Sequence, residues 1–168
     1  MQDYISLVKN QIKSKKHVII TGDRGSGKTT LLQKILCHTE IGRNSRGLVT
    51  WCEPGKAVYM KCVDSDDKVM IGIFNPDSTS KENRMRPVSQ GFSEYGVLTL
   101  QHFAESNAEW ISIDEIGYLE SSCYTYIEKL EELFEKKRVI AVVRKQETEL
   151  IKKIVSRSDV LIIDLDKH

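Results

Sequence analysis

The sequence has no apolar run that approaches the roughly 20 residues needed to cross a membrane as a helix. Residues 1–16, MQDYISLVKNQIKSKK, include Asp3 and contain no continuous apolar segment, so they do not resemble a secretory signal. The hydrophobic fraction of 40% and the charged fraction of 29% are typical of a soluble globular protein. We therefore expect a cytoplasmic protein that does not bind a membrane.

An excess of charge of either sign is also missing. The chain has 25 basic and 24 acidic residues, which give a formal net charge of +1. Such a balance provides no overall field to attract DNA, RNA or an anionic lipid surface, although local patches remain possible. We expect no nucleic-acid partner, and the sequence identifies no protein partner.

Cysteine is scarce and scattered. There are four cysteines and no C-x-x-C pair or histidine pair at metal-binding spacing. This pattern favours free thiols over a zinc site or a redox pair. Cys52 and Cys62 could face each other across a hairpin.

The patterning predicts one α/β domain over residues 1–168, because a chain of this length forms one core comfortably. We expect a leading amphipathic helix in residues 1–15. Strands are expected at 17–21, 46–51, 110–113, 139–143 and 160–163, and helices at 28–38, 98–107, 121–136 and 147–155. This alternation predicts a mainly parallel sheet flanked by helices.

Two segments interrupt the alternation. Residues 56–74 contain two strand-like runs around the turn DSDD, and they predict an added β-hairpin. Residues 75–91 are polar, hold two of the three prolines and show no periodicity, so we expect a mobile loop there.

The segment after the first strand has the complete pattern G-x-x-x-x-G-K-[ST], the Walker A motif of a P-loop. Its glycines allow successive N–H groups to turn inward, and the following helix adds its positive end, so the loop can hold phosphate oxygens. Lys28 would reach the β- and γ-phosphates, and the Thr29 hydroxyl would be a Mg²⁺ ligand. The alternative is a glycine-rich turn that binds nothing. The predicted nucleotide-binding residues are Gly22, Asp23, Arg24, Gly25, Ser26, Gly27, Lys28, Thr29 and Thr30.

A second motif lies in WISIDEIGYLE, an apolar run that ends in Asp114 and Glu115 and has the form of a Walker B element. Asp114 would hold Mg²⁺ through water. Glu115 would orient or deprotonate a water molecule that attacks the γ-phosphorus. The alternative for Glu115 is a surface glutamate that follows the aspartate by chance.

NTPases that use such a glutamate usually have one further strand between the P-loop strand and the Walker B strand. The expected RecA-like order is therefore 160–163, 17–21, 139–143, 110–113, 46–51. In this order Arg144 would point toward the γ-phosphate and stabilise its charge, or else be a solvated arginine. Arg84 and Arg86 could fold over the phosphates as a lid or pair with surface acids.

Several segments in the same order resemble the nucleoside-triphosphatases of the cancer-related type. These segments are GDRGSGKTTLLQKI, GLVTWCE, the hairpin, IDEIGYLES, LIKKIVSR and DVLIIDL. The resemblance implies Mg²⁺-dependent hydrolysis of nucleoside triphosphates to diphosphate and phosphate, with broad base tolerance. Tyr118 replaces a family lysine, and Lys56 is only an approximate substitute for a family arginine.

Two other functions are compatible with the same motifs. A small-molecule or nucleotide kinase would need the loop at 75–91 to supply an acceptor site. A nucleotide-dependent switch would use slow hydrolysis only to reset itself.

Overall fold

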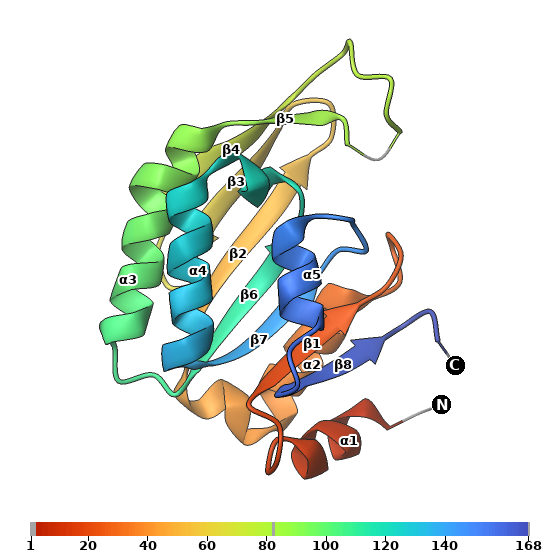
Figure 1. The fold of residues 1–168 in the computed structure, drawn as a ribbon, viewed down its shortest axis with the longest axis vertical. Coiled ribbons are helices and arrows are strands. Elements are labelled where there is room, and N and C mark those ends of the chain that lie inside the picture. The colour runs from red at the N-terminus through yellow and green to blue at the C-terminus, as the bar shows by residue number, and fades with distance from the viewer. Residues whose placement is uncertain (1–2, 82, 168) are drawn as a thin grey trace.

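A computed structural model describes residues 3–81 and 83–167. Its centre is an eight-stranded sheet with the order β5-β4-β3-β2-β6-β7-β1-β8 (Figure 1). The strands are β1 (His17–Thr21), β2 (Ser45–Glu53), β3 (Ala57–Cys62), β4 (Lys68–Phe74), β5 (Met85–Pro87), β6 (Trp110–Ile116), β7 (Arg138–Val143) and β8 (Val160–Asp164).

The parallel part of the sheet runs β8-β1-β7-β6-β2. This arrangement confirms the expected mainly parallel sheet and the expected strand order, with β7 inserted between β1 and β6. Because all these strands point the same way, their carboxyl ends meet at one edge of the sheet.

The added hairpin is formed by β3 and β4, as predicted, and β3 also pairs antiparallel with β2. The expectation of an irregular loop over residues 75–91 is wrong in part. Residues 85–87 form the edge strand β5 against β4, and helical structure already begins at Ser89. A three-residue strand that contains proline has no alternating pattern, and an edge position tolerates the missing N–H of Pro87. Glu82, which also falls in this expected loop, lies outside the described residues.

Helices cover both faces of the sheet (Figure 1). One face carries α1 and α2, and the other carries α3, α4 and α5. The helices are α1 (Tyr4–Gln11), α2 (Lys28–His38), α3 (Val97–Glu105), α4 (Tyr124–Lys136) and α5 (Glu149–Val155). Among the described residues, no helix is long and apolar enough to cross a bilayer.

The helix boundaries differ from the expected ones mainly at the N-terminal ends. A π-helical turn at Gly91–Gly96 leads directly into α3, and a 3₁₀ turn at Leu119–Ser122 precedes α4. Of the predicted leading segment 1–15, α1 occupies the central part, while Met1 and Gln2 lie outside the described residues. The strands also extend further than expected, and β6 continues through Ile116.

Two apolar cores lie on the two faces of the sheet. All residues of β1 are buried, with Val18 and Ile20 packed toward α1 and α2 and Ile19 packed toward the opposite core. This alternation follows from the pleat of a strand, and it explains why the central strands are apolar throughout. The rigid core fixes the strand ends that carry the polar side chains described next.

The cysteines are free thiols. In the β2–β3 ladder Cys52 lies opposite Val58, whereas Cys62 lies opposite Leu48. Cys52 and Cys62 therefore do not face each other, because the register separates them along the ladder.

Candidate active site

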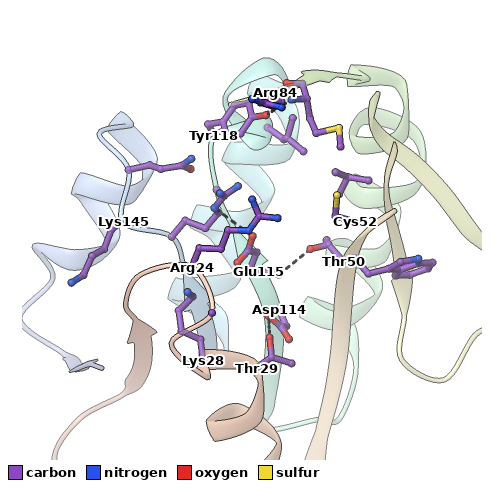
Figure 2. A pocket seen from close by; sticks show the side chains of 18 of the residues that line it. Arg24, Lys28, Thr29, Thr50, Cys52, Arg84, Asp114, Glu115, Tyr118 and Lys145 are labelled. Atoms are coloured by element: carbon purple, nitrogen blue, oxygen red, sulfur yellow. Dashed lines mark hydrogen bonds and ion pairs between the residues drawn. The ribbon is translucent and has the colours of Figure 1, made fainter. Parts of the chain in front are cut away.

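The glycine-rich loop connects β1 to α2 at the carboxyl edge of the sheet. Gly25 and Gly27 have φ angles of 79° and 93°, and residues that carry a Cβ rarely adopt such values. The Lys28 ammonium group folds back onto the loop and donates hydrogen bonds to the carbonyl oxygens of Gly22 (2.9 Å) and Asp23 (2.7 Å). The loop is therefore a closed turn with a lysine at its centre (Figure 2).

The same loop is tied to the segment after β8. The Asp23 N–H donates to the Asp166 carboxylate at 2.7 Å, and Lys145 forms ion pairs with Asp164 at 2.9 Å and Asp166 at 2.5 Å. The hydrogen bonds from Lys145 hold the pKa of both aspartates below the usual range. Sequence analysis did not find this clamp; its only signal is that Lys145 and Asp164 lie at the ends of strands flanking β1.

Thr29, in the first turn of α2, contacts Asp114 at the end of the glycine-rich loop. The Thr29 hydroxyl donates to Asp114 Oδ1 at 3.2 Å, which joins the first turn of α2 to β6. Burial raises the pKa of Asp114, and the bond from Thr29 opposes this shift. No cluster of three or more His, Cys, Asp or Glu side chains suited to a metal occurs in residues 3–81 and 83–167. Two adjacent hard oxygens nevertheless fit Mg²⁺, which usually takes its remaining ligands from water and phosphate.

Glu115 lies at an irregularity in β6. The β6–β7 register shifts between Asp114 and Ile116, so both acidic residues stand at the site although alternation in a regular strand would separate them. The Glu115 N–H donates to the Thr50 hydroxyl at 3.1 Å. Thr50 comes from the predicted strand GLVTW, which the expected order already places beside β6, but its contact with Glu115 depends on the register of the two strands.

Arg144 follows β7 and lies 3.6 Å from Glu115, measured from Nε to Oε1. Burial raises the pKa of Glu115, whereas the positive charge of Arg144 opposes that shift. Figure 2 shows Glu115 beside the glycine-rich loop, close to Arg24 and Lys28. The structure thus places the predicted residues of the loop, β6 and the end of β7 at one edge of the sheet, and all of them except Ser26 line one pocket.

One pocket of about 980 Å³ contains these side chains and extends past Glu115 to β4 and β5. Arg84 lines its far end near Tyr118 (Figure 2). Arg86 is exposed and is not among the residues that line the pocket. The Tyr118 hydroxyl donates to the Met85 carbonyl at 2.8 Å and accepts from the Met85 N–H at 3.0 Å, which attaches β5 to the segment after β6.

Glu120 is a further acidic residue of the pocket, and it is only 3% exposed. Its Oε2 accepts a hydrogen bond from the Gly117 N–H at 2.9 Å. Burial raises the pKa of Glu120 to about 8, so the side chain is largely a neutral acid at pH 7. Sequence analysis included Glu120 only as part of a family motif and assigned it no role.

Comparison with known proteins agrees with this geometry. The family described as NTPase matches residues 17–168. The chain is similar to nucleoside-triphosphatase THEP1 of Thermotoga sp. strain RQ2 and of Thermotoga maritima. In each case it is 29% identical over 154 residues, covering 89% of this chain and 86% of the relative.

Solved structures show the same fold. THEP1 of the hyperthermophile Aquifex aeolicus superposes with a TM-score of 0.70 at 23% identity, covering 89% of each chain. A human cancer-related nucleoside triphosphatase superposes with a TM-score of 0.65 at 18% identity, covering 88% of this chain and 87% of that one. The glycine-rich loop, the expected strand order and the match over residues 17–168 thus lead to one conclusion: the chain belongs to the NTPase family and has the P-loop NTPase fold.

Proposed function

We propose that this protein hydrolyses nucleoside triphosphates to diphosphate and phosphate in a Mg²⁺-dependent reaction. The observation that carries the proposal is that the glycine-rich loop, Asp114 and Glu115 lie in one pocket at the carboxyl edge of the sheet. The related THEP1 proteins are described as nucleoside-triphosphatases, which supports the same activity here.

The loop residues Gly22–Thr30 bind the triphosphate. Their backbone N–H groups and the N-terminus of α2 attract the phosphate oxygens. Lys28 exchanges its bonds with the carbonyl oxygens of Gly22 and Asp23 for bonds with the β- and γ-phosphates. The lysine is thereby available at the site without a large movement of the backbone.

Thr29 and Asp114 would hold Mg²⁺, Thr29 directly and Asp114 through water. Their contact of 3.2 Å places two hard oxygen ligands side by side. When bound, the ion neutralises negative charge on the β- and γ-phosphates.

Glu115 activates the attacking water. Its carboxylate accepts a hydrogen bond from the water and takes the proton as the water oxygen bonds to the γ-phosphorus. The bond from the γ-phosphorus to the bridging oxygen then breaks, and the diphosphate leaves with that oxygen. Thr50 and Arg144 fix Glu115 from two sides, through its backbone N–H and its carboxylate respectively.

The Glu115→Gln variant tests this function directly. We expect it to bind Mg²⁺-ATP and Mg²⁺-GTP as the wild type does, because the glutamine keeps the shape of the side chain. Phosphate release should fall by about 100-fold or more, because the amide cannot accept the proton. Phosphate release and nucleotide binding are measured on the same preparations. Release at the native rate would refute the proposed role of Glu115.

The same assay separates hydrolysis from the two other functions. A kinase would release little phosphate and would transfer it to an added hydroxyl compound. A switch would bind nucleotide tightly and turn it over negligibly until a partner was added. The proposal requires phosphate release by the purified protein alone.

A further inference from the structure

We infer that the Arg24 side chain acts in cis as a catalytic cation that contacts the γ-phosphoryl group. The inference rests on the proposed function, and it concerns a side chain that the glycine-rich motif itself does not require. In G-x-x-x-x-G-K-[ST], position 24 is variable, so the motif assigns only the backbone N–H of this residue to phosphate binding.

The position of Arg24 is the first argument. Arg24 lines the same pocket as Lys28, Asp114 and Glu115. Figure 2 shows its side chain extending from the glycine-rich loop toward Glu115.

The second argument is that the other cations near the loop are already engaged. Lys28 bonds to loop carbonyl oxygens, and Arg144 pairs with Glu115. Within residues 3–81 and 83–167, the Arg24 guanidinium has no hydrogen bond or ion pair. An uncompensated cation in a site built for a polyanion is ready to bind it, and it needs no internal contact to be broken first.

The third argument concerns the chemistry of the transition state. As the bond to the leaving diphosphate breaks, negative charge is spread over the γ-phosphoryl oxygens and the bridging oxygen. A planar guanidinium donates two parallel hydrogen bonds to such oxygens, which an ammonium group cannot do with the same geometry. Arg24 would therefore stabilise the transition state more than the bound triphosphate, and its loss should lower kcat more than it weakens binding.

The experiment compares the wild type with Arg24→Gln, Arg24→Lys and the control Arg86→Gln. Arg86 is also an exposed arginine, but it does not line the pocket. For Arg24→Gln we expect kcat to fall by about 100-fold and KM to change by less than about fivefold. Arg24→Lys should retain an intermediate rate, and Arg86→Gln should remain within about twofold of the wild type.

Two binding measurements separate a catalytic role from a structural one. Nucleoside diphosphate should bind Arg24→Gln as it binds the wild type, whereas the preference for a non-hydrolysable triphosphate over the diphosphate should fall by about fivefold. Diphosphate with aluminium fluoride, which imitates the transferring group, should no longer be trapped by this variant. Adding methylguanidinium to Arg24→Ala should restore part of the rate.

The outcomes distinguish this inference from the proposed function. If the wild type hydrolyses triphosphate and Arg24→Gln keeps both the rate and the triphosphate preference, the role of Arg24 is refuted and the proposed function stands. If the wild type releases no phosphate but Arg24→Gln loses the triphosphate preference, the contact stands and the proposed hydrolysis fails. A loss of diphosphate binding together with a lower unfolding temperature would show a structural role and overturn the inference.

Discussion

The ion pair between Arg144 and Glu115 joins the ends of two neighbouring strands at the site. The two side chains are 30% and 35% exposed, so solvent screens the pair and its contribution to folding is small. Its main effect is geometric, because it fixes the direction of the Glu115 carboxylate, while Thr50 holds the backbone N–H of the same residue.

We therefore predict that Arg144→Ala slows hydrolysis by roughly 10- to 100-fold, since a misplaced base loses alignment with the attacking water. The melting temperature should change by no more than a few degrees, because the pair is partly exposed. Phosphate release and thermal unfolding measure the two effects, and Arg86→Ala is the control. An unchanged rate would remove Arg144 from the catalytic machinery.

At the scale of elements, the Tyr118 side chain attaches β5 from outside the sheet. This strand pairs only with β4 and is three residues long, so it gains little from its own ladder. The Tyr118 hydroxyl makes two hydrogen bonds with the Met85 backbone and connects β5 to the end of β6. Arg84, which lines the pocket and directly precedes Met85, is thereby held close to the end of β6.

For Tyr118→Phe we predict faster hydrogen exchange at the Met85 amide, by roughly fivefold to tenfold, because each lost hydrogen bond contributes about 1 kcal/mol. Exchange in β1 and β7 should not change, because their amides are protected by the buried core. The matched control is Tyr124→Phe, since Tyr124 is 72% exposed on α4. Equal exchange at Met85 in the wild type and Tyr118→Phe would contradict the role given to Tyr118.

At the scale of the whole molecule, two buried ionisable side chains make stability depend on pH in opposite directions. The His17 side chain is fully buried, and burial lowers its pKa to about 4 from an ordinary value of 6.5. Its Nδ1 accepts a hydrogen bond from the Val139 N–H at 3.1 Å. Between pH 4 and 6.5 only the unfolded chain binds the proton at His17, so stability rises with pH there.

Glu120 acts in the opposite sense. Its pKa is about 8 in the folded protein and 4.5 in the absence of burial, so between these values the folded state retains a proton that the unfolded state has released. Stability attributable to Glu120 is therefore fully present below pH 4.5 and decreases as pH rises toward 8. The contribution of His17 levels off as the pH rises through 6.5, so of these two side chains Glu120 dominates the pH dependence above that value.

We predict that the free energy of unfolding decreases between pH 6.5 and 8, by up to about 1.4 kcal/mol per pH unit. In Glu120→Gln this slope should disappear, because the neutral amide still accepts the bond from Gly117 but does not titrate. Urea unfolding of the nucleotide-free protein at several pH values measures the effect. A slope that persists in Glu120→Gln would show that another group causes it.

Much of the fold could be predicted from local pattern. The five β-branched or apolar strand segments and the helix at Lys28–His38 have strong periodic signals, and the rules for parallel sheets then restrict their order. The edge strand β5 and the π-helical turn before α3 could not be predicted in this way. Both depend on a neighbouring element: β5 pairs with the free edge of β4, and the π-helical turn packs against β4 and α4.

The sequence by itself determined the glycine-rich loop, the adjacent acids Asp114 and Glu115, and the lysine at the loop centre, because these features depend on neighbouring residues. Only the tertiary structure decided which distant groups meet them: Thr50 at the Glu115 N–H and Asp166 at the Asp23 N–H. These contacts join residues up to 143 positions apart. Their partners are chosen by strand register and by packing of the two faces, which no short stretch of sequence encodes.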